Sequence, residues 1–123
     1  MCTHVVVNGN IKFAFRSPLN PTGHEEWYKQ YEKHGDGVKD VAFTVDDSAG
    51  IYGKAVERGA KSVMEPKELK DEFGTVIVSS VQTYGDTTHT FVQRVNYTGI
   101  FLPGFKPHHL SEPFNKLIAQ PEL

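Results

Sequence analysis

The sequence contains a single cysteine, and this scarcity excludes several kinds of structure. Cys2 alone cannot form an internal disulfide or a cysteine-based zinc site. The charges nearly balance, with 13 Lys+Arg against 15 Asp+Glu, so no electrostatic signature for nucleic acid or an anionic membrane is present. The sequence also lacks an apolar run near the roughly 20 residues of a membrane helix, and it lacks the basic start of a signal peptide. We therefore expect a soluble, intracellular protein located in the cytoplasm.

The length and composition favour one folded domain. A chain of 123 residues is enough for one hydrophobic core but too short for two typical domains. Hydrophobic residues make up 38% of the chain, which is too high a fraction for a disordered protein.

Periodicity predicts an α+β fold. Asn8-Gly9 between two β-rich runs predicts a β-hairpin, because both residues tolerate the positive φ of a tight turn. Asp46-Asp47-Ser48 predicts the N-cap of a helix that ends at Arg58-Gly59. The charged stretch 67–73 is interpreted as a solvated loop. The expected strands are 3–7, 11–16, 38–46, 62–65 (stopped by Pro66), 75–81 and 89–95, and a further short helix is expected over 24–34.

This order places one complete βαβββ unit between Val38 and Val95. The preceding hairpin is interpreted as the end of another such unit, whose opening strand, helix and strand are missing. Prolines and scattered aromatics beyond Asn96 indicate a packed, irregular tail or an interdomain linker.

Four residues near the middle of the chain could bind a metal ion: His34, Asp36, Asp40 and His89. Two histidines and a carboxylate suit non-haem Fe(II), but only if the side chains converge. Strand alternation places Thr90, not His89, on the face shared with Arg94. Turn chemistry and a hydrogen-bonded histidine are therefore favoured over a metal site.

Other motifs fail on spacing or context. A zincin helix needs a second histidine four positions after His24, where Tyr28 stands. No G-x-S-x-G nucleophile elbow is present. The remaining matches also have simpler explanations. Cys2 beside His4 is interpreted as an unactivated thiol, and Gly35-Asp36-Gly37 as a turn before a strand. Asn96-Tyr97-Thr98 is interpreted as a chance match to a glycosylation sequon, and His108-His109 as a solvent-facing pair.

Several uncommon blocks lie in the order found in one enzyme family. They are LNP (19–21), HGDGVKDVAF (34–43), ERGAK (57–61), EP (65–66), QTYGDTTHT (82–90), NYTG (96–99) and FLPGF (101–105). Together they closely resemble the N-terminal domain of the 4-hydroxyphenylpyruvate dioxygenase family, from about Thr3 to about Phe105.

The resemblance implies the vicinal oxygen chelate fold, built of βαβββ modules in curved sheets. It also implies membership in a homodimeric enzyme that uses Fe(II) and O₂ to convert 4-hydroxyphenylpyruvate to homogentisate and CO₂, in the catabolism of tyrosine and phenylalanine. In that family two histidines and a glutamate of the C-terminal domain bind the iron, and this chain lacks that domain. By the same resemblance, Asp40 of this chain lies at the position of one histidine ligand, and Thr90 lies at the position of the glutamate ligand. The hydroxyl group of a threonine is a poor replacement for a carboxylate as a ligand of Fe(II). The resemblance therefore transfers no catalytic, cofactor-binding or metal-binding residue to this chain.

We expect residues 1–105 to form a partial N-terminal vicinal oxygen chelate domain and residues 106–123 to form an interdomain linker or tail. The expected function is the non-catalytic, structural and oligomerisation half of the dioxygenase, with no Fe(II) bound to this chain. The alternative is a stand-alone binding or dimerisation module of the same superfamily. A self-sufficient metalloenzyme using His34, Asp40 and His89 is the weakest hypothesis.

Overall fold

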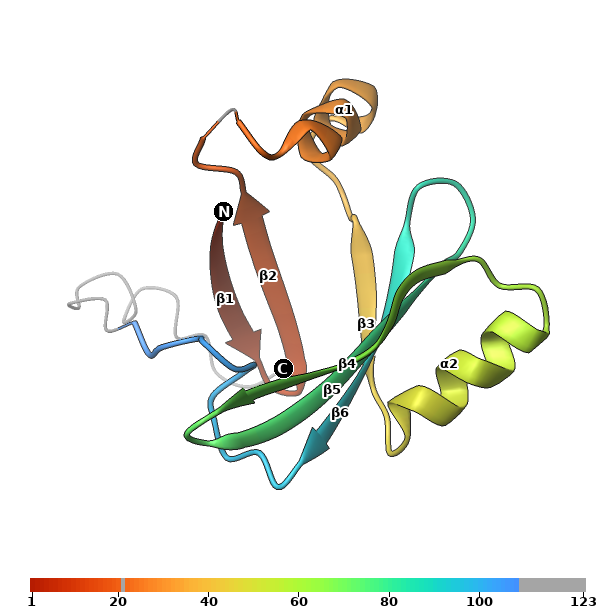
Figure 1. Ribbon diagram of the computed structural model, residues 1–123. Helices are drawn as coiled ribbons and strands as arrows, with labels where there is room; N and C mark the ends of the chain where they lie inside the picture. Colours follow the sequence, from red (N-terminus) through yellow and green to blue (C-terminus); the bar gives the residue numbers. More distant parts are fainter. Residues whose placement is uncertain (21, 109–123) are drawn as a thin grey trace.

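The computed structural model describes residues 1–20 and 22–108 and has an α+β architecture (Figure 1). A two-stranded hairpin lies beside a four-stranded sheet, and the described residues form two helices. Neither of these helices is long and apolar enough to cross a membrane. The residues from 109 onward, which include His109 and most of the predicted linker, lie outside this description.

The hairpin consists of β1 (Cys2–Asn8) and β2 (Ile11–Ser17), which pair antiparallel in full register. Gly9 in the connecting turn has a φ of 59°, a left-handed conformation that glycine adopts without a steric penalty. The hairpin predicted from Asn8-Gly9 is therefore confirmed.

The four-stranded sheet contains β3 (Asp40–Thr44), β4 (Ser62–Asp71), β5 (Gly74–Gln82) and β6 (Thr88–Val95). Their spatial order is β3-β6-β5-β4, with β3 parallel to β6 and the other pairs antiparallel. Helix α2 (Ser48–Glu57) connects β3 to β4 and begins where predicted, because the Asp47 side chain accepts a hydrogen bond from the Gly50 amide. The βαβββ order predicted from the sequence is confirmed.

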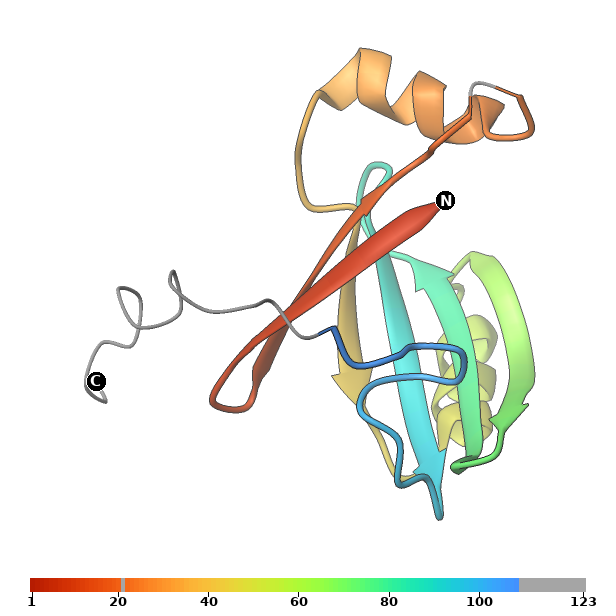
Figure 2. The same ribbon diagram turned by 90° about the vertical axis from the view of Figure 1, so that its left-hand side faces the viewer.

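The two faces of the sheet are covered differently. Helix α2 packs on one face, and the segment after β6 crosses the other face (Figure 2). The second face holds the main apolar cluster, formed by Val76, Val78 and Val92 and covered by Met64, Leu69, Tyr97 and Leu102. The segment after β6 therefore covers one end of the sheet face on which the polar cluster described below lies.

Strand β4 corrects the sequence prediction. We expected a strand that stops at Pro66, followed by a charged loop over 67–73, but β4 continues to Asp71. The register with β5 shifts between Ser62 and Met64 and again between Met64 and Lys67, so Pro66 lies in an irregular part of the ladder. An edge strand tolerates proline at such a place, because the missing N–H has no ladder partner to lose. Charged side chains then protect the exposed edge from further pairing.

Helix α1 (Glu25–His34) is also present as predicted, although it buries none of its residues. Its last turn is held to the β5–β6 turn by polar contacts. Lys33 Nζ lies 2.6 Å and His34 Nε2 lies 2.9 Å from the same oxygen of Asp86. Lys39, just before β3, donates to the Asp86 carbonyl oxygen and to Gln30 of α1. A polar clamp around Asp86 therefore attaches α1 to the sheet.

Candidate functional site

The most organised polar group on the open sheet face is a cluster of Asp40, Thr88, Thr90 and Ser80. The Thr90 hydroxyl donates to Asp40 Oδ1 over 2.8 Å, and the Thr88 hydroxyl donates to the same oxygen. Ser80 Oγ lies 2.7 Å from Thr90 Oγ1. Because the Thr90 proton is committed to the carboxylate, Ser80 must be the donor to Thr90. The cluster is thus a chain of hydroxyl groups that ends on one carboxylate oxygen.

Strand pairing explains why these side chains meet. Thr88 lies opposite Asp40 in the parallel β3–β6 pair, and Thr90 lies opposite Ser80 in the antiparallel β5–β6 pair. Alternation then places all of them on the sheet face away from α2. Arg94 lies further along this face and donates to Thr44 Oγ1 and to the Phe101 carbonyl oxygen, each over 3.2 Å. The prediction that Thr90 shares a face with Arg94 is therefore confirmed.

The donor set of this cluster does not fit Fe(II). Among its four side chains only Asp40 offers a carboxylate, no imidazole is present, and hydroxyl groups are weak ligands for this ion. Within residues 1–20 and 22–108, no group of three or more histidine, cysteine, aspartate or glutamate side chains is placed to hold a metal ion. We therefore derive no step of chemistry through iron at this cluster.

The four candidate ligands predicted from the sequence do not converge. His34 is bonded to Asp86, whereas Asp40 is bonded to Thr88 and Thr90. His89 lies on the face opposite Asp40, with Nδ1 3.2 Å from the Val41 carbonyl oxygen and its ring edge-on to Phe43 at 5.1 Å. The structure thus favours the hydrogen-bonded histidine that was weighed against a metal site.

Other residues singled out in the sequence have local roles. Cys2 Sγ lies 3.4 Å from His4 Nε2, and the ring of His4 is 6.4 Å from that of His108. His24 is the residue before α1, but its side chain caps no amide. Asn96 adopts a φ of 52°, which fits a turn residue directly after β6.

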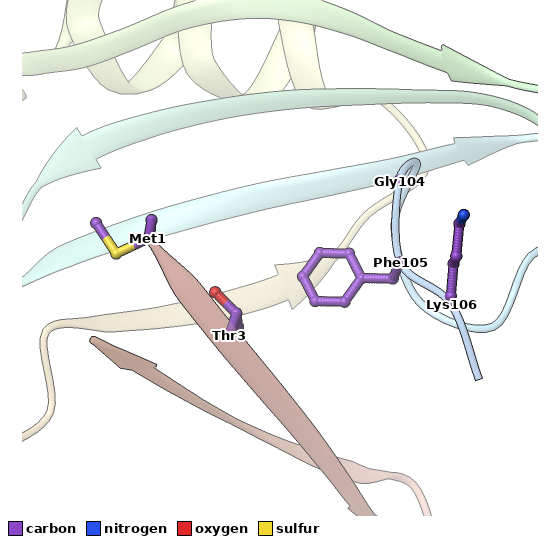
Figure 3. Close-up of a pocket in the computed structure, with 5 residues that line it drawn as sticks. All are labelled: Met1, Thr3, Gly104, Phe105 and Lys106. Atoms are coloured by element: carbon purple, nitrogen blue, oxygen red, sulfur yellow. The ribbon is translucent and has the colours of Figure 1, made fainter. Parts of the chain in front are cut away.

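A shallow hollow lies between the start of β1 and the segment after β6. It is lined by Met1, Thr3, Gly104, Phe105 and Lys106, and Figure 3 shows the ring of Phe105 turned toward the strand that carries Thr3. Lys106 is the single charged side chain among these five residues, so the lining offers no acid–base pair. Thr3 is the residue of β1 that lines the hollow, so the side of β1 that carries Thr3 faces the segment 104–106.

The Asp86 clamp carries the clearest electrostatic effect in the described structure. Hydrogen bonds from Lys33 and His34, reinforced by the charge of Lys33, lower the pKa of Asp86 from its ordinary 3.8 to about 2. At any pH at which the Asp86 carboxyl group is ionised, it therefore stabilises the contact between α1 and the β5–β6 turn.

We expect acid to loosen α1 before it unfolds the sheet. A carboxyl group with a lowered pKa stabilises the folded form above its unfolded pKa, and this contribution is lost as the pH falls from near 3.8 toward 2. The protection factors of the amides of residues 25–34, which are corrected for the intrinsic pH dependence of exchange, should therefore fall across this range before those of β5. Asp86→Asn should already show low protection of these amides at pH 6, with no further fall at acidic pH. Unchanged exchange in that variant would contradict a role for the clamp.

The fold and the cluster together define an α+β domain with a hydroxyl-rich, hydrogen-bonded sheet face. Its sequence is similar to curated 4-hydroxyphenylpyruvate dioxygenases. The relative from Tetrahymena thermophila is 46% identical over 121 residues, which cover 96% of this chain. The relative from Dictyostelium discoideum is 49% identical over 117 residues, and that from Danio rerio is 50% identical over 112 residues. The resemblance seen in the sequence blocks is therefore confirmed.

The similarity is confined to part of each relative. The chain spans 30%, 31% and 28% of the length of these three proteins. No protein-family model matches the chain. The activity of the complete relatives therefore enters below as a proposal about this chain.

Proposed function

We propose that this chain is a non-catalytic segment of a 4-hydroxyphenylpyruvate dioxygenase. The observation that carries the proposal is a similarity of 42–50% identity over most of the chain, confined to less than a third of each relative. The enzyme's reaction would be conversion of 4-hydroxyphenylpyruvate and O₂ to homogentisate and CO₂, in cytoplasmic tyrosine catabolism. Its Fe(II) would be bound by the family's C-terminal domain, which is the main proposed partner of this segment.

The polar cluster supports the non-catalytic part of the proposal. The family resemblance places Asp40 and Thr90 where the catalytic half of the enzyme carries a histidine and a glutamate ligand. Here these two side chains are hydrogen-bonded to one another over 2.8 Å. A carboxylate oxygen that accepts from two hydroxyl groups suits a structural role, because both lone pairs of Oδ1 are already used. We therefore assign this segment to support of the catalytic domain and of the homodimer interface.

The fold supports a vicinal oxygen chelate arrangement for residues 1–105. The strand order β3-β6-β5-β4 with α2 on one face forms one βαβββ unit. Under this proposal, β1–β2 would be the end of a preceding module. Residues 106–123 would then connect this domain to the catalytic one.

The first test is the chain itself. We expect the purified chain to bind no stoichiometric Fe(II) under anaerobic conditions and to produce no homogentisate from 4-hydroxyphenylpyruvate and O₂. The D. discoideum relative, assayed in parallel, serves as the positive control. Homogentisate production above a metal-free sample would overturn the non-catalytic assignment.

A second test asks whether the segment works in its proposed context. Grafting this chain in place of the matching 117 residues of the D. discoideum relative should give a hybrid that retains homogentisate production. A hybrid carrying Gly74→Ala is the matched control for loss of folding in the graft. A folded, iron-loaded hybrid without activity would contradict the proposal.

The alternative function, a stand-alone dimerisation module, is favoured by one observation. Strand β3 is an edge of the sheet, and Val41 and Phe43 on it are 40% and 45% exposed. An exposed apolar edge invites pairing with another strand. Sedimentation of the purified chain separates the two functions, since a strictly monomeric, cooperatively unfolding species contradicts the dimerisation module.

A further inference from the structure

A cavity lies between α1 and the end of the open sheet face that the segment after β6 leaves uncovered. Figures 1 and 2 show α1 at the end of the sheet where β3 begins. Glu26 and Gln30 of α1 line the cavity together with Lys39, Gln82 and Thr88 of the sheet and its approach. Its volume of about 430 Å³ lies within the range of small-molecule sites. The helix and the sheet therefore form a site large enough for a small polar ligand.

Strand pairing brings the sheet residues of this cavity to one face. Thr88 belongs to the polar cluster on the open face, and Gln82 is its cross-strand partner. The Ser62 side chain contacts α2 on the other face. Alternation then places its neighbours Lys61 and Val63, which also line the cavity, on the open face.

Lys39 carries a charge that no carboxylate compensates. It is partly buried, and its Nζ donates to the Asp86 carbonyl oxygen over 2.9 Å and to Gln30 Oε1 over 3.3 Å, which are both neutral acceptors. Within residues 1–20 and 22–108, Lys39 forms no salt bridge. A partly buried cation with neutral partners alone is costly. An anion in the cavity would supply the missing counter-charge.

The donors that remain unused in the cavity suit an oxyanion. An ammonium group has three N–H donors, so Lys39 keeps one for a ligand. Because Gln30 Oε1 accepts from Lys39, the NH₂ group of Gln30 adds two donors. Lys61 adds a second ammonium group, which also forms no salt bridge with the part of the chain that the structure describes. We propose that this cavity binds the oxyanion group of a small ligand, a carboxylate or a phosphate, with Lys39 as its central donor.

Two carboxylates line the same cavity, and they differ in their partners. Asp86 Oδ2 is already paired with Lys33 over 2.6 Å and with His34 over 2.9 Å. Glu26 forms no salt bridge among the described residues, so its charge would oppose an anion. The proposal therefore predicts that removing the Glu26 charge strengthens binding. It is independent of the reaction proposed above, because it depends on the cavity alone.

The test titrates the full ¹⁵N-labelled chain separately with sodium phosphate and sodium acetate, at an ionic strength held constant with sodium chloride. We expect at least one probe to shift the amides of residues 39 and 86–88 saturably, with a dissociation constant of about 1–10 mM. The probe that binds more tightly identifies the oxyanion group. Failure of both probes to saturate, or equal shifts with sodium chloride alone, would overturn the proposal.

Lysine variants locate the site. Lys39→Met should weaken binding of the tighter probe about tenfold, and Lys61→Met, on an exposed side chain, about threefold. Lys67→Met is the matched control, because Lys67 is an exposed residue of β4 outside the cavity lining. Its affinity should stay within about 1.5-fold of the parent chain. Equal losses in the three variants would show an effect of net charge alone and contradict the assigned site.

A gain of affinity keeps the proposal falsifiable if Lys39→Met releases α1 from the sheet. Glu26→Gln should strengthen binding about threefold, because it removes the opposing charge, and loss of structure cannot produce such a gain. Glu32→Gln, which removes the same charge from α1 outside the cavity lining, should leave the affinity unchanged. Weaker binding in Glu26→Gln would make Glu26 a ligand-binding group and overturn the oxyanion assignment.

Discussion

Gly74→Ala should destabilise the fold by about 3 kcal/mol, because two independent penalties act at this position. Gly74 begins β5 with a φ of 130°, which side chains of L-residues rarely adopt. A Cβ atom there would also lie 2.5 Å from the Asn96 carbonyl oxygen and 3.0 Å from Tyr97 Cα. These are backbone atoms of the segment that covers the apolar cluster, so they cannot simply rotate away. Urea unfolding followed by far-UV circular dichroism measures the loss.

Gly85→Ala is the matched control for this prediction. Gly85 also has a positive φ, 61°, but nothing lies within 4 Å of its Cβ position. The backbone penalty alone should therefore cost about 1 kcal/mol. Equal destabilisation by the two substitutions would show that the close approach of Asn96 to β5 contributes nothing.

Ser48→Val should destabilise the fold by about 3 kcal/mol, since it removes buried hydrogen bonds and adds volume at a filled site. The Ser48 hydroxyl is fully buried between Ser79 and the Phe91 carbonyl oxygen. A branched apolar side chain would leave the hydroxyl of Ser79 without its closest partner. The same denaturant experiment, combined with amide exchange in α2, should show both global loss and weaker seating of the helix.

Ser48→Ala separates the two causes. Alanine removes the hydroxyl without adding volume, so its expected cost is about 1–2 kcal/mol. The double variant with Ser79→Ala should cost less than the sum of the single changes, because both substitutions remove one shared hydrogen bond. Strict additivity would mean that the 2.8 Å contact between the hydroxyl groups carries no stability.

The elements with strong local signals could be predicted from the sequence. The hairpin could be predicted from Asn8-Gly9 and the start of α2 from Asp47, because turn geometry and capping depend on neighbouring residues alone. Strand β4 could not be predicted in full, because its charged half and Pro66 are acceptable only at the edge of a sheet. Edge position is a property of the assembled sheet and leaves no signature within the strand itself.

The polar cluster was predictable only in part. The family resemblance singled out Asp40 and Thr90, and the structure joins them directly. Thr88 and Ser80 were missed, although alternation along β6 would have placed Thr88 on the face of Thr90. Ser80 could be found only after the β5–β6 register was known, since its link to Thr90 depends on cross-strand pairing.

The location of the sole tryptophan has a practical consequence for spectroscopy. Trp27 lies in α1, the helix attached to the sheet through Asp86, while the apolar cluster is built from valines of β5 and β6. Intrinsic indole emission will therefore report the release of one peripheral helix, and circular dichroism will report melting of the sheet. The two signals should give different midpoints, so an unfolding curve from emission alone would assign the stability of α1 to the whole domain.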